Sequence, residues 1–194
     1  MDSAAPSRIR RARIEDADAI AHVHHRSWEE TYPGLLPPEL IVPLDERLGQ
    51  WRRIIHENPA GVGRFVAEVD APTVGDDMRF APADAPDVRI VGIAQCGPAR
   101  EPELETRYEI GRIYVLRAAQ GVGVGKALMG AMFDALRASH VGGEDRSVGL
   151  WVLKGNDRAI EFYERMGARV TGTIKRDERH GFIVEDVGMR WDSF

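Results

Sequence analysis

A glycine-rich segment, Gln120-Gly-Val-Gly-Val-Gly-Lys126, is the residue pattern with the clearest chemical meaning in this chain. It follows a β-forming run that ends near Val115 and leads into a helical pattern that begins at Val124. Glycine lets the main chain approach a ligand closely, and free N–H groups at a helix N-terminus stabilise phosphate charge. The segment is therefore expected to bind a phosphorylated molecule.

Two familiar phosphate-binding motifs do not fit this segment. A Walker loop needs a glycine where Gln120 stands and a serine or threonine where Ala127 stands. A dinucleotide loop of the form G-x-G-x-x-G needs glycine at Lys126 or at Leu128, depending on where it starts. A plain turn that connects strand to helix is the remaining alternative, although such a turn rarely needs alternating glycines.

Four stretches place apolar residues at helical spacing and so predict the helices around this loop. Asp45 is the expected N-cap of the second, and Gly167 is expected to stop the fourth. The third, after the glycine loop, has a well-formed apolar face. The predicted helices cover residues 15–30, 45–56, 124–139 and 157–166.

Strand-forming residues alternate with these helices along the chain. Residues 147–153 are apolar at nearly every position, which indicates a strand covered on both faces, as in a parallel or mixed sheet. The order predicts an α/β fold with a mixed central sheet of about six to seven strands and about four flanking helices. The strands are expected near Arg8 and at 65–69, 88–95, 107–116, 147–153, 170–175 and 182–191, the last two joined by the charged segment 176–181.

Length and composition indicate one globular domain over residues 8–194. Residues 1–7 are small and polar and are expected to be disordered, and residues 71–87, rich in proline and aspartate, are expected to form a mobile insertion. With 26 basic and 31 acidic residues the formal charge is 26 − 31 = −5, which argues against a nucleic-acid partner. Without a long apolar run or a secretory signal, a membrane partner is not expected and a cytoplasmic location is the simplest interpretation.

Cysteine and histidine give no sign of a thiol or metal centre. Cys96 lies in a β-rich run with no activating base beside it in the sequence, so a buried position in the core is expected. His22, His24 and His25 share one predicted helix without carboxylates at a matching spacing. We therefore expect no metal.

The glycine segment also matches the pattern R/Q-x-x-G-x-G/A through Gln120, Gly123 and Gly125. This pattern is the pyrophosphate loop of the GNAT acetyltransferase superfamily, which the chain resembles from about Ile9 to Trp191. The run Glu109-Ile-Gly-Arg-Ile-Tyr-Val115 is similar to the fourth strand of that family. The runs Asn156-Asp-Arg-Ala-Ile-Glu-Phe-Tyr163 and Met166-Gly-Ala168 are similar to its last shared block.

The resemblance implies acetyl-coenzyme A as co-substrate and no metal. It places the pantetheine arm and the thioester beside the end of the fourth strand, with the N–H of Val115 polarising the acetyl carbonyl. Lys126 either adds attraction for the phosphates or is simply solvated. The implied coenzyme contacts are Ile113, Tyr114, Val115, Gln120, Gly121, Val122, Gly123, Val124, Gly125, Lys126, Asn156, Ala159, Phe162 and Tyr163.

Three residues receive chemical roles from the same resemblance, each with a structural alternative. Tyr163 protonates the departing thiolate or packs in the core with Phe162. Glu109 removes the proton from the amine, directly or through water, or is an exposed charge at a strand end. Asn156 contacts the coenzyme, caps its helix, or does both.

The acceptor is implied to be a primary amine of a small molecule or peptide. Trp28, Glu29 and Tyr32 are the candidate acceptor contacts, although Trp28 is also a plausible core residue and Glu29 a plausible solvated one. A non-catalytic sensor that binds acyl-coenzyme A is the alternative function, and Tyr163 and Glu109 argue against it. A homodimer is left open, because relatives of this family often pair through sheet edges.

Overall fold

The computed structural model describes residues 8–71, 77–139 and 145–193, and the predicted disordered segment 1–7 lies outside them. One mixed sheet carries the strand order β1-β2-β3-β4-β5-β7-β6, so the predicted fold class is confirmed. β4 and β5 run parallel, whereas the other neighbouring strands are antiparallel. The strands are β1 (Arg8–Arg11), β2 (Gly63–Asp70), β3 (Val88–Pro98), β4 (Tyr108–Val115), β5 (Val148–Leu153), β6 (Arg169–Arg179) and β7 (Phe182–Trp191).

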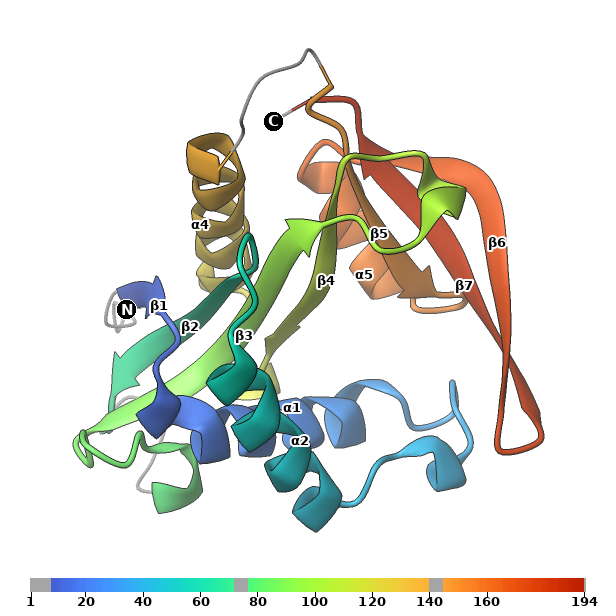
Figure 1. Cartoon of the computed structure of the whole chain (residues 1–194). Helices are drawn as coiled ribbons and strands as arrows, with labels where there is room; N and C mark the ends of the chain where they lie inside the picture. The colour runs from blue at the N-terminus through green and yellow to red at the C-terminus, as the bar shows by residue number, and fades with distance from the viewer. Residues whose placement is uncertain (1–7, 72–76, 140–144, 194) are drawn as a thin grey trace.

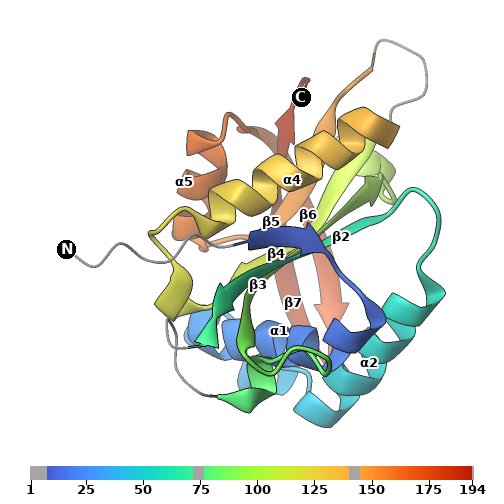
Figure 2. The same cartoon turned by 90° about the vertical axis from the view of Figure 1, so that its left-hand side faces the viewer.

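In the described part of the chain, four helices cover the two faces of this sheet, as Figures 1 and 2 show. Helices α1 and α2 pack together on one face, and α4 lies against β2, β3 and β4 on the other. α5 shares the face of α4, because the Phe162 ring lies against Gly125 at the start of α4. Their bounds are α1 (Ala17–Thr31), α2 (Leu44–Glu57), α4 (Val124–Ser139) and α5 (Asp157–Arg165).

Helix α2 and the last hairpin differ from the boundaries predicted from the sequence. Helix α2 begins at Leu44 after Pro43, so Asp45 lies in the first turn, where its charge faces the helix dipole, and does not cap the helix. The predicted connection 176–181 is mostly strand, because β6 continues to Arg179. Its charged residues pair across the hairpin, as Arg176 does with Glu185 at 2.7 Å, so the charge stabilises a ladder.

The first helix also starts later than the predicted residue 15. Residues Ile14–Asp16 form a short 3-10 turn, and the buried carboxylate of Asp16 accepts a hydrogen bond from the N–H of Arg13 at 2.7 Å. The guanidinium of Arg10 pairs with the same carboxylate at 2.6 Å. Asp16 therefore ties β1 to the start of α1.

The main core lies between the sheet and α4. Leu128, Met129 and Met132 of α4 are fully buried, as is Val148 on β5. Cys96 is 1% exposed in this core, and burial raises the pKa of its thiol to about 11. The buried core position predicted for Cys96 is confirmed, and at this pKa the thiol is neutral at neutral pH.

Residues 72–76 of the predicted mobile insertion lie outside the described residues, and its mobility stays a prediction. The described part holds a 3-10 turn, Met78–Phe80, and the Phe80 ring meets His22 of α1 at 6.3 Å between ring centroids. The two ends of the segment are joined, because the N–H of Ala71 donates to the carbonyl of Asp87 at 2.9 Å. Among the described helices, none has both the length and the apolar character needed to cross a membrane.

Candidate active site

Strands β4 and β5 separate after a short contact. They pair at Tyr108 with Val148 and at Glu109 with Gly149, and no further pair joins them. A shift of register opposite Gln95 and Cys96 marks a bulge in β4, which bends the strand away from β5. The two strands diverge toward their C-terminal ends, as Figure 1 shows. The edge of β4 is therefore left unpaired where its sequence reads Ile113-Tyr-Val115.

Backbone groups of β4 point into this gap. The N–H of Leu116 donates to the carbonyl of Val91 on β3 at 2.9 Å. In an antiparallel ladder alternate residues face the same neighbour, so Tyr114 also turns its backbone groups to β3. The N–H groups of Ile113 and Val115 consequently face the gap. The carbonyl of Val115 accepts a hydrogen bond from the side-chain amide of Gln120 at 2.8 Å, which ties the glycine loop to the strand end.

The glycine loop presents a row of unpaired N–H groups. Gly121 and Gly123 have φ angles of 81° and 96°, in the left-handed region that favours glycine. The first backbone hydrogen bond of α4 runs from the N–H of Ala127 to the carbonyl of Gly123 at 3.0 Å. Within the described chain, the N–H groups of residues 121–126 have no acceptor. Val122 and Lys126 are exposed, and the described residues place no carboxylate in ion-pair contact with Lys126.

Helix α5 closes the other side of the loop. A Cβ on Gly125 would lie 3.3 Å from the Phe162 ring, so a larger residue there would press the two helices slightly apart or shift the ring. Asn156 caps α5, its side-chain oxygen accepting from the N–H of Ala159 at 3.3 Å. The capping role left open by the sequence is thus present, and the side-chain N–H₂ of Asn156 is not used by the cap. Contact of these α5 residues with a coenzyme stays a prediction.

Three tyrosines meet at the end of the gap. Burial raises the pKa of Tyr163, which packs edge-on against Phe162 and Trp191 at centroid distances of 5.3 and 6.2 Å. Burial also raises the pKa of Tyr32, and the neighbouring phenol of Tyr114 adds to the shift for both tyrosines. The predicted acceptor residue Tyr32 and the predicted acid Tyr163 are thereby brought together with Tyr114. The raised pKa values of Tyr32 and Tyr163 keep these two phenols protonated at neutral pH.

Glu109 is buried, and its carboxylate is engaged by one arginine. Its Oε1 forms an ion pair with the guanidinium of Arg100, and its Oε2 accepts from the N–H of Arg100 at 3.1 Å. The alternative of an exposed strand-end charge was wrong, because the residue is only 8% exposed. Arg100 would have to release this carboxylate if Glu109 were to accept a proton from an amine.

The three predicted acceptor residues on and after α1 do not all meet. Trp28 is half-buried and meets Tyr32 edge-on at a centroid distance of 4.9 Å. Glu29 is exposed and pairs with His25 and Arg26, each at 3.6 Å. The structure therefore assembles Trp28 and Tyr32 and turns Glu29 away from them. Whether any of the three contacts an acceptor stays a prediction.

Sequence reasoning missed three charged residues around this aromatic cluster. Arg47 of α2 lies over the Trp28 ring at 5.2 Å, and Arg112 of β4 lies over the Trp51 ring at 5.2 Å. Asp186 of β7 is half-buried, and burial raises its pKa although Arg179 lies 3.6 Å away. A signal was present for Arg47: it stands four residues before Trp51, so it shares the inward face of its helix.

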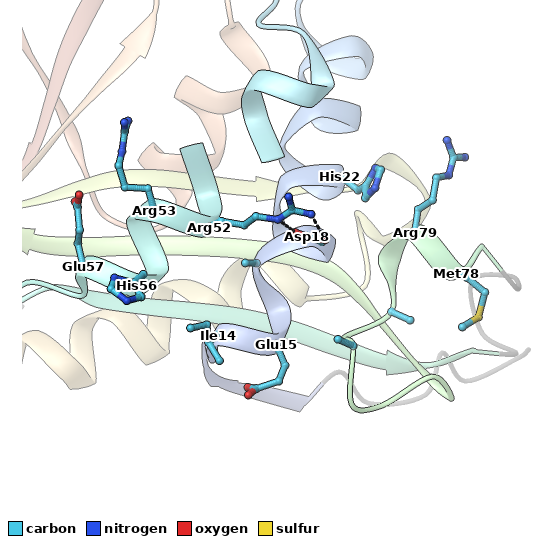
Figure 3. A pocket seen from close by; sticks show the side chains of 13 residues that line it. Ile14, Glu15, Asp18, His22, Arg52, Arg53, His56, Glu57, Met78 and Arg79 are labelled. Atoms are coloured by element: carbon cyan, nitrogen blue, oxygen red, sulfur yellow. Dashed lines mark hydrogen bonds and ion pairs between the residues drawn. The ribbon is translucent and has the colours of Figure 1, made fainter. Parts of the chain in front are cut away.

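A surface pocket lies elsewhere on the molecule. Its volume is about 780 Å³, and it opens between α1, α2 and the 3-10 turn Met78–Phe80. Figure 3 shows Asp18 and Arg52 pairing within it, with Oδ1 and Nε 2.7 Å apart. It shares no lining residue with the glycine loop or the tyrosines. This pocket is therefore separate from the candidate active site.

The described residues bring together no group of three or more His, Cys, Asp or Glu side chains suited to a metal. The histidines of α1 have other partners. The Nδ1 of His24 accepts a hydrogen bond from the Trp51 indole at 2.9 Å, and the Nδ1 of His25 lies 3.2 Å from the carbonyl of Val42.

Comparison with known proteins agrees with this geometry. The chain is 26% identical over 185 residues to the uncharacterized N-acetyltransferase YuaI of Bacillus subtilis (strain 168), covering 94% of this chain and 91% of that protein. An N-acetyltransferase of Staphylococcus aureus Mu50 has a similar structure, with a TM-score of 0.64, 17% identity, and 97% and 99% of the two chains covered.

A second solved structure is yncA of Salmonella typhimurium, determined with its cofactor acetyl-CoA. Its TM-score is 0.61 at 18% identity, with 97% of this chain and 94% of that one covered. The model of the family described as "Acetyltransferase (GNAT) family" matches residues 20–168, which include the glycine loop and the strands that separate. This chain belongs to the GNAT acetyltransferase family.

Proposed function

We propose that this protein binds acetyl-coenzyme A and transfers the acetyl group directly to an amine. The main support is a series of backbone N–H groups, without acceptors in the described chain, that runs from the end of β4 to the start of α4. The N–H groups of Ile113 and Val115 face the gap between β4 and β5, and the N–H groups of residues 121–126 stand free at the start of α4. An elongated molecule with amide groups at one end and phosphates at the other matches that sequence of donors.

The pyrophosphate of the coenzyme would bind the amides of residues 121–126, and its pantetheine arm would pair with the edge of β4. This places the thioester near Val115, whose N–H would polarise the carbonyl and stabilise negative charge on its oxygen. Phe162 and Ala159 of α5 would cover the arm, because α5 already contacts the loop at Gly125. Lys126 would add a solvent-screened attraction for phosphate.

Transfer forms a bond from the amine nitrogen to the acetyl carbon and breaks the carbon–sulfur bond. The departing thiolate would receive its proton from Tyr163, whose raised pKa keeps the phenol protonated until negative charge develops on sulfur. The proton leaving the amine would go to a carboxylate or to water. Glu109 would need to exchange its Arg100 contact for this role, whereas Asp186 is half-buried near Tyr32 with a raised pKa.

Direct attack is favoured over a covalent enzyme intermediate. Cys96 is the single cysteine of the chain. It is buried, its pKa is raised to about 11, and its Sγ lies 3.7 Å from the carbonyl of Met132 in the core beside α4. It is therefore neither ionised nor accessible to a thioester in the gap.

Calorimetric titration with acetyl-coenzyme A, followed by thiol release across a panel of amines and peptides, tests the proposal. Saturable binding with amine-dependent thiol release is the expected result. Binding without release from any amine would favour a sensor of acyl-coenzyme A instead. Failure to bind acetyl-coenzyme A would contradict the proposed function altogether.

A further inference from the structure

Arg47 is a buried cation without an anionic partner. It is 6% exposed on the inward face of α2, and its Nη1 donates to the side-chain oxygen of Gln50 at 3.2 Å. Its Nε and Nη2 have no hydrogen-bond partner within the described chain. A buried charge is costly unless it is paired, so this guanidinium is poised for an anion.

Arg112 brings a second positive charge into the same region. It is half-buried on β4, and its Nη1 donates to the side-chain oxygen of Gln95 at 3.4 Å. No carboxylate of the described residues lies within ion-pair distance of either arginine. Arg47 lies over the Trp28 ring and Arg112 over the Trp51 ring, and the His24 ring meets both of these rings at centroid distances of 5.8 Å, so the two guanidiniums border one aromatic cluster. Burial lowers the pKa of Arg47, and the charge of Arg112 also acts to lower it.

Neutral donors surround the two arginines. The His24 ring accepts from Trp51 at Nδ1, so its other nitrogen, Nε2, carries the proton. That Nε2 and the Nε1 of Trp28 are both buried without a partner in the described chain. The unused groups of this region are thus mainly donors, which together suit a ligand rich in acceptor oxygens.

This region adjoins the proposed reaction centre. The Tyr114 ring stacks on the His24 ring with centroids 4.6 Å apart, and its phenol influences the pKa of both Arg47 and Arg112. Tyr114 directly precedes Val115, whose N–H faces the gap where the thioester is proposed to lie. A small acceptor could therefore place an anionic group at the arginines and its amine near the acetyl group.

We propose that the acceptor is an amine that also carries an anionic group, and that Arg47 and Arg112 bind the oxygens of that group. The inference rests on the proposed function and specifies the substrate class of the same site. A carboxylate and a phosphonate share the required chemistry, and a bidentate guanidinium contact fits either.

The test compares acceptors that have the same amine but carry a carboxylate, a phosphonate or a neutral carboxamide. Thiol release is measured for L-amino acids with small, aliphatic, aromatic and charged side chains, for their carboxamides, and for the corresponding 1-aminoalkylphosphonates. The anionic acceptors should exceed the carboxamides in kcat/KM by about 10- to 100-fold, the range expected for hydrogen bonds to a charged group. The ratio of carboxylate to phosphonate identifies which anion fits better.

Substitution of the arginines assigns the effect to this region. Arg47→Gln should raise KM for anionic acceptors by about 10-fold or more and leave carboxamides almost unchanged, and Arg112→Gln, on a different element, should act in the same direction. Arg53→Gln is the matched control, because Arg53 is exposed on the same helix and the charge change is identical. Thermal unfolding of each variant verifies that it folds.

The outcomes separate this inference from the proposed function. If carboxamides react as well as amino acids, or if Arg47→Gln slows both equally, the anionic class is wrong although acetyl transfer stands. If no amine in the panel releases thiol, acetyl transfer loses its support. In that case, calorimetric titration of the coenzyme A complex with amino acids and with their carboxamides tests the anion site separately. Binding of the amino acids alone, weakened by Arg47→Gln, would support the anion site. Absence of such binding would overturn it.

Discussion

The two sides of the gap between β4 and β5 offer different chemical groups to a ligand: backbone N–H groups on one side and side chains on the other. On the side of α4, the candidate coenzyme site consists of backbone N–H groups within one short segment, residues 121–126. On the side of α1 and α2, the candidate acceptor site consists of side chains from separate elements, among them Trp28, Arg47 and Tyr114. The first is fixed by local backbone conformation and the second by tertiary packing.

This difference suggests how the two sides respond to change. A backbone site tolerates most side-chain replacements and is sensitive at glycines with positive φ, because other residues alter its geometry. A side-chain site can change its ligand through one substitution without disturbing the fold. Substitutions on the acceptor side can therefore change the acceptor without changing how the coenzyme binds.

The largest expected effect lies where the two sides meet, at Tyr163. Tyr163→Phe keeps the ring contacts with Phe162 and Trp191 but removes the phenol. We expect kcat to fall by about 10²- to 10⁴-fold, the usual contribution of a general acid, with little change in acetyl-coenzyme A affinity. Steady-state kinetics and calorimetry measure the two quantities. Full activity in the variant would assign Tyr163 to the core alone.

Gly123 tests the backbone side. Its φ of 96° is costly for any residue with a Cβ, by about 1–2 kcal/mol, although a Cβ there would meet no atom within 4 Å. Gly123→Ala should therefore reorient the loop amides and weaken acetyl-coenzyme A binding by about 10-fold, since 1.4 kcal/mol corresponds to a factor of ten.

Gly130 supplies the matched control for this variant. It lies inside α4, and a Cβ at Gly130 would also meet no atom within 4 Å. Gly130→Ala should stabilise the protein by about 0.4–1 kcal/mol and leave coenzyme affinity unchanged, because it restricts the unfolded chain at a helical position. Equal losses of affinity in both variants, by calorimetry, would argue against a special role for the loop.

The pH dependence of stability in an Asp186 variant tests the acceptor side of the gap. Burial raises its pKa in the folded state, in spite of Arg179 and Lys175 and with help from Asp177 and Glu101. Its contribution to stability is therefore present at low pH and is lost as the pH rises through the folded-state pKa. Asp186→Asn should raise Tm relative to the wild type more at pH 8 than at pH 4. A larger gain at pH 4 would show that the charged form is the better accommodated one.

Lys126 is expected to give the smallest effect. Its side chain is exposed at the start of α4, so its attraction for phosphate is screened by salt. Lys126→Gln should weaken acetyl-coenzyme A binding by only about 2- to 5-fold at low ionic strength, consistent with an interaction of about 0.3–1 kcal/mol near a helix N-terminus. The difference should disappear at high salt in calorimetric titrations. A loss that persists there would show that Lys126 makes a desolvated contact.

The sequence was most informative where structure is local. The helix at 124–139 has its predicted bounds, because its apolar face and the preceding glycines are encoded in consecutive residues. β7 likewise has its predicted limits. The predicted order of strands and helices was also confirmed. The continuous apolar run in β5 was a local signal of a strand covered on both faces, and β5 does pair in parallel with β4.

The acceptor side could not be derived in the same way. The inward position of Arg47 was encoded by its spacing to Trp51, but its pairing state depends on residues from α1 and β4. The capture of Glu109 by Arg100 arises from the loop before β4, where no periodic pattern marks the contact. Asp186 lies between Leu153 of β5 and Lys175 of β6 in the sheet, so its burial depends on strands that are distant in the sequence. Such contacts are set by tertiary structure and leave little trace in local sequence.

Amide NMR spectra recorded during titration with coenzyme A show residue by residue whether the free backbone amides of the loop and of β4 bind the coenzyme. We expect saturable shifts for the amides of Gly121, Gly123, Gly125 and Lys126, and for those of Ile113 and Val115, with small changes on the outer face of α2. Saturable binding that leaves the amides of residues 121–126 unshifted would contradict the proposed coenzyme site.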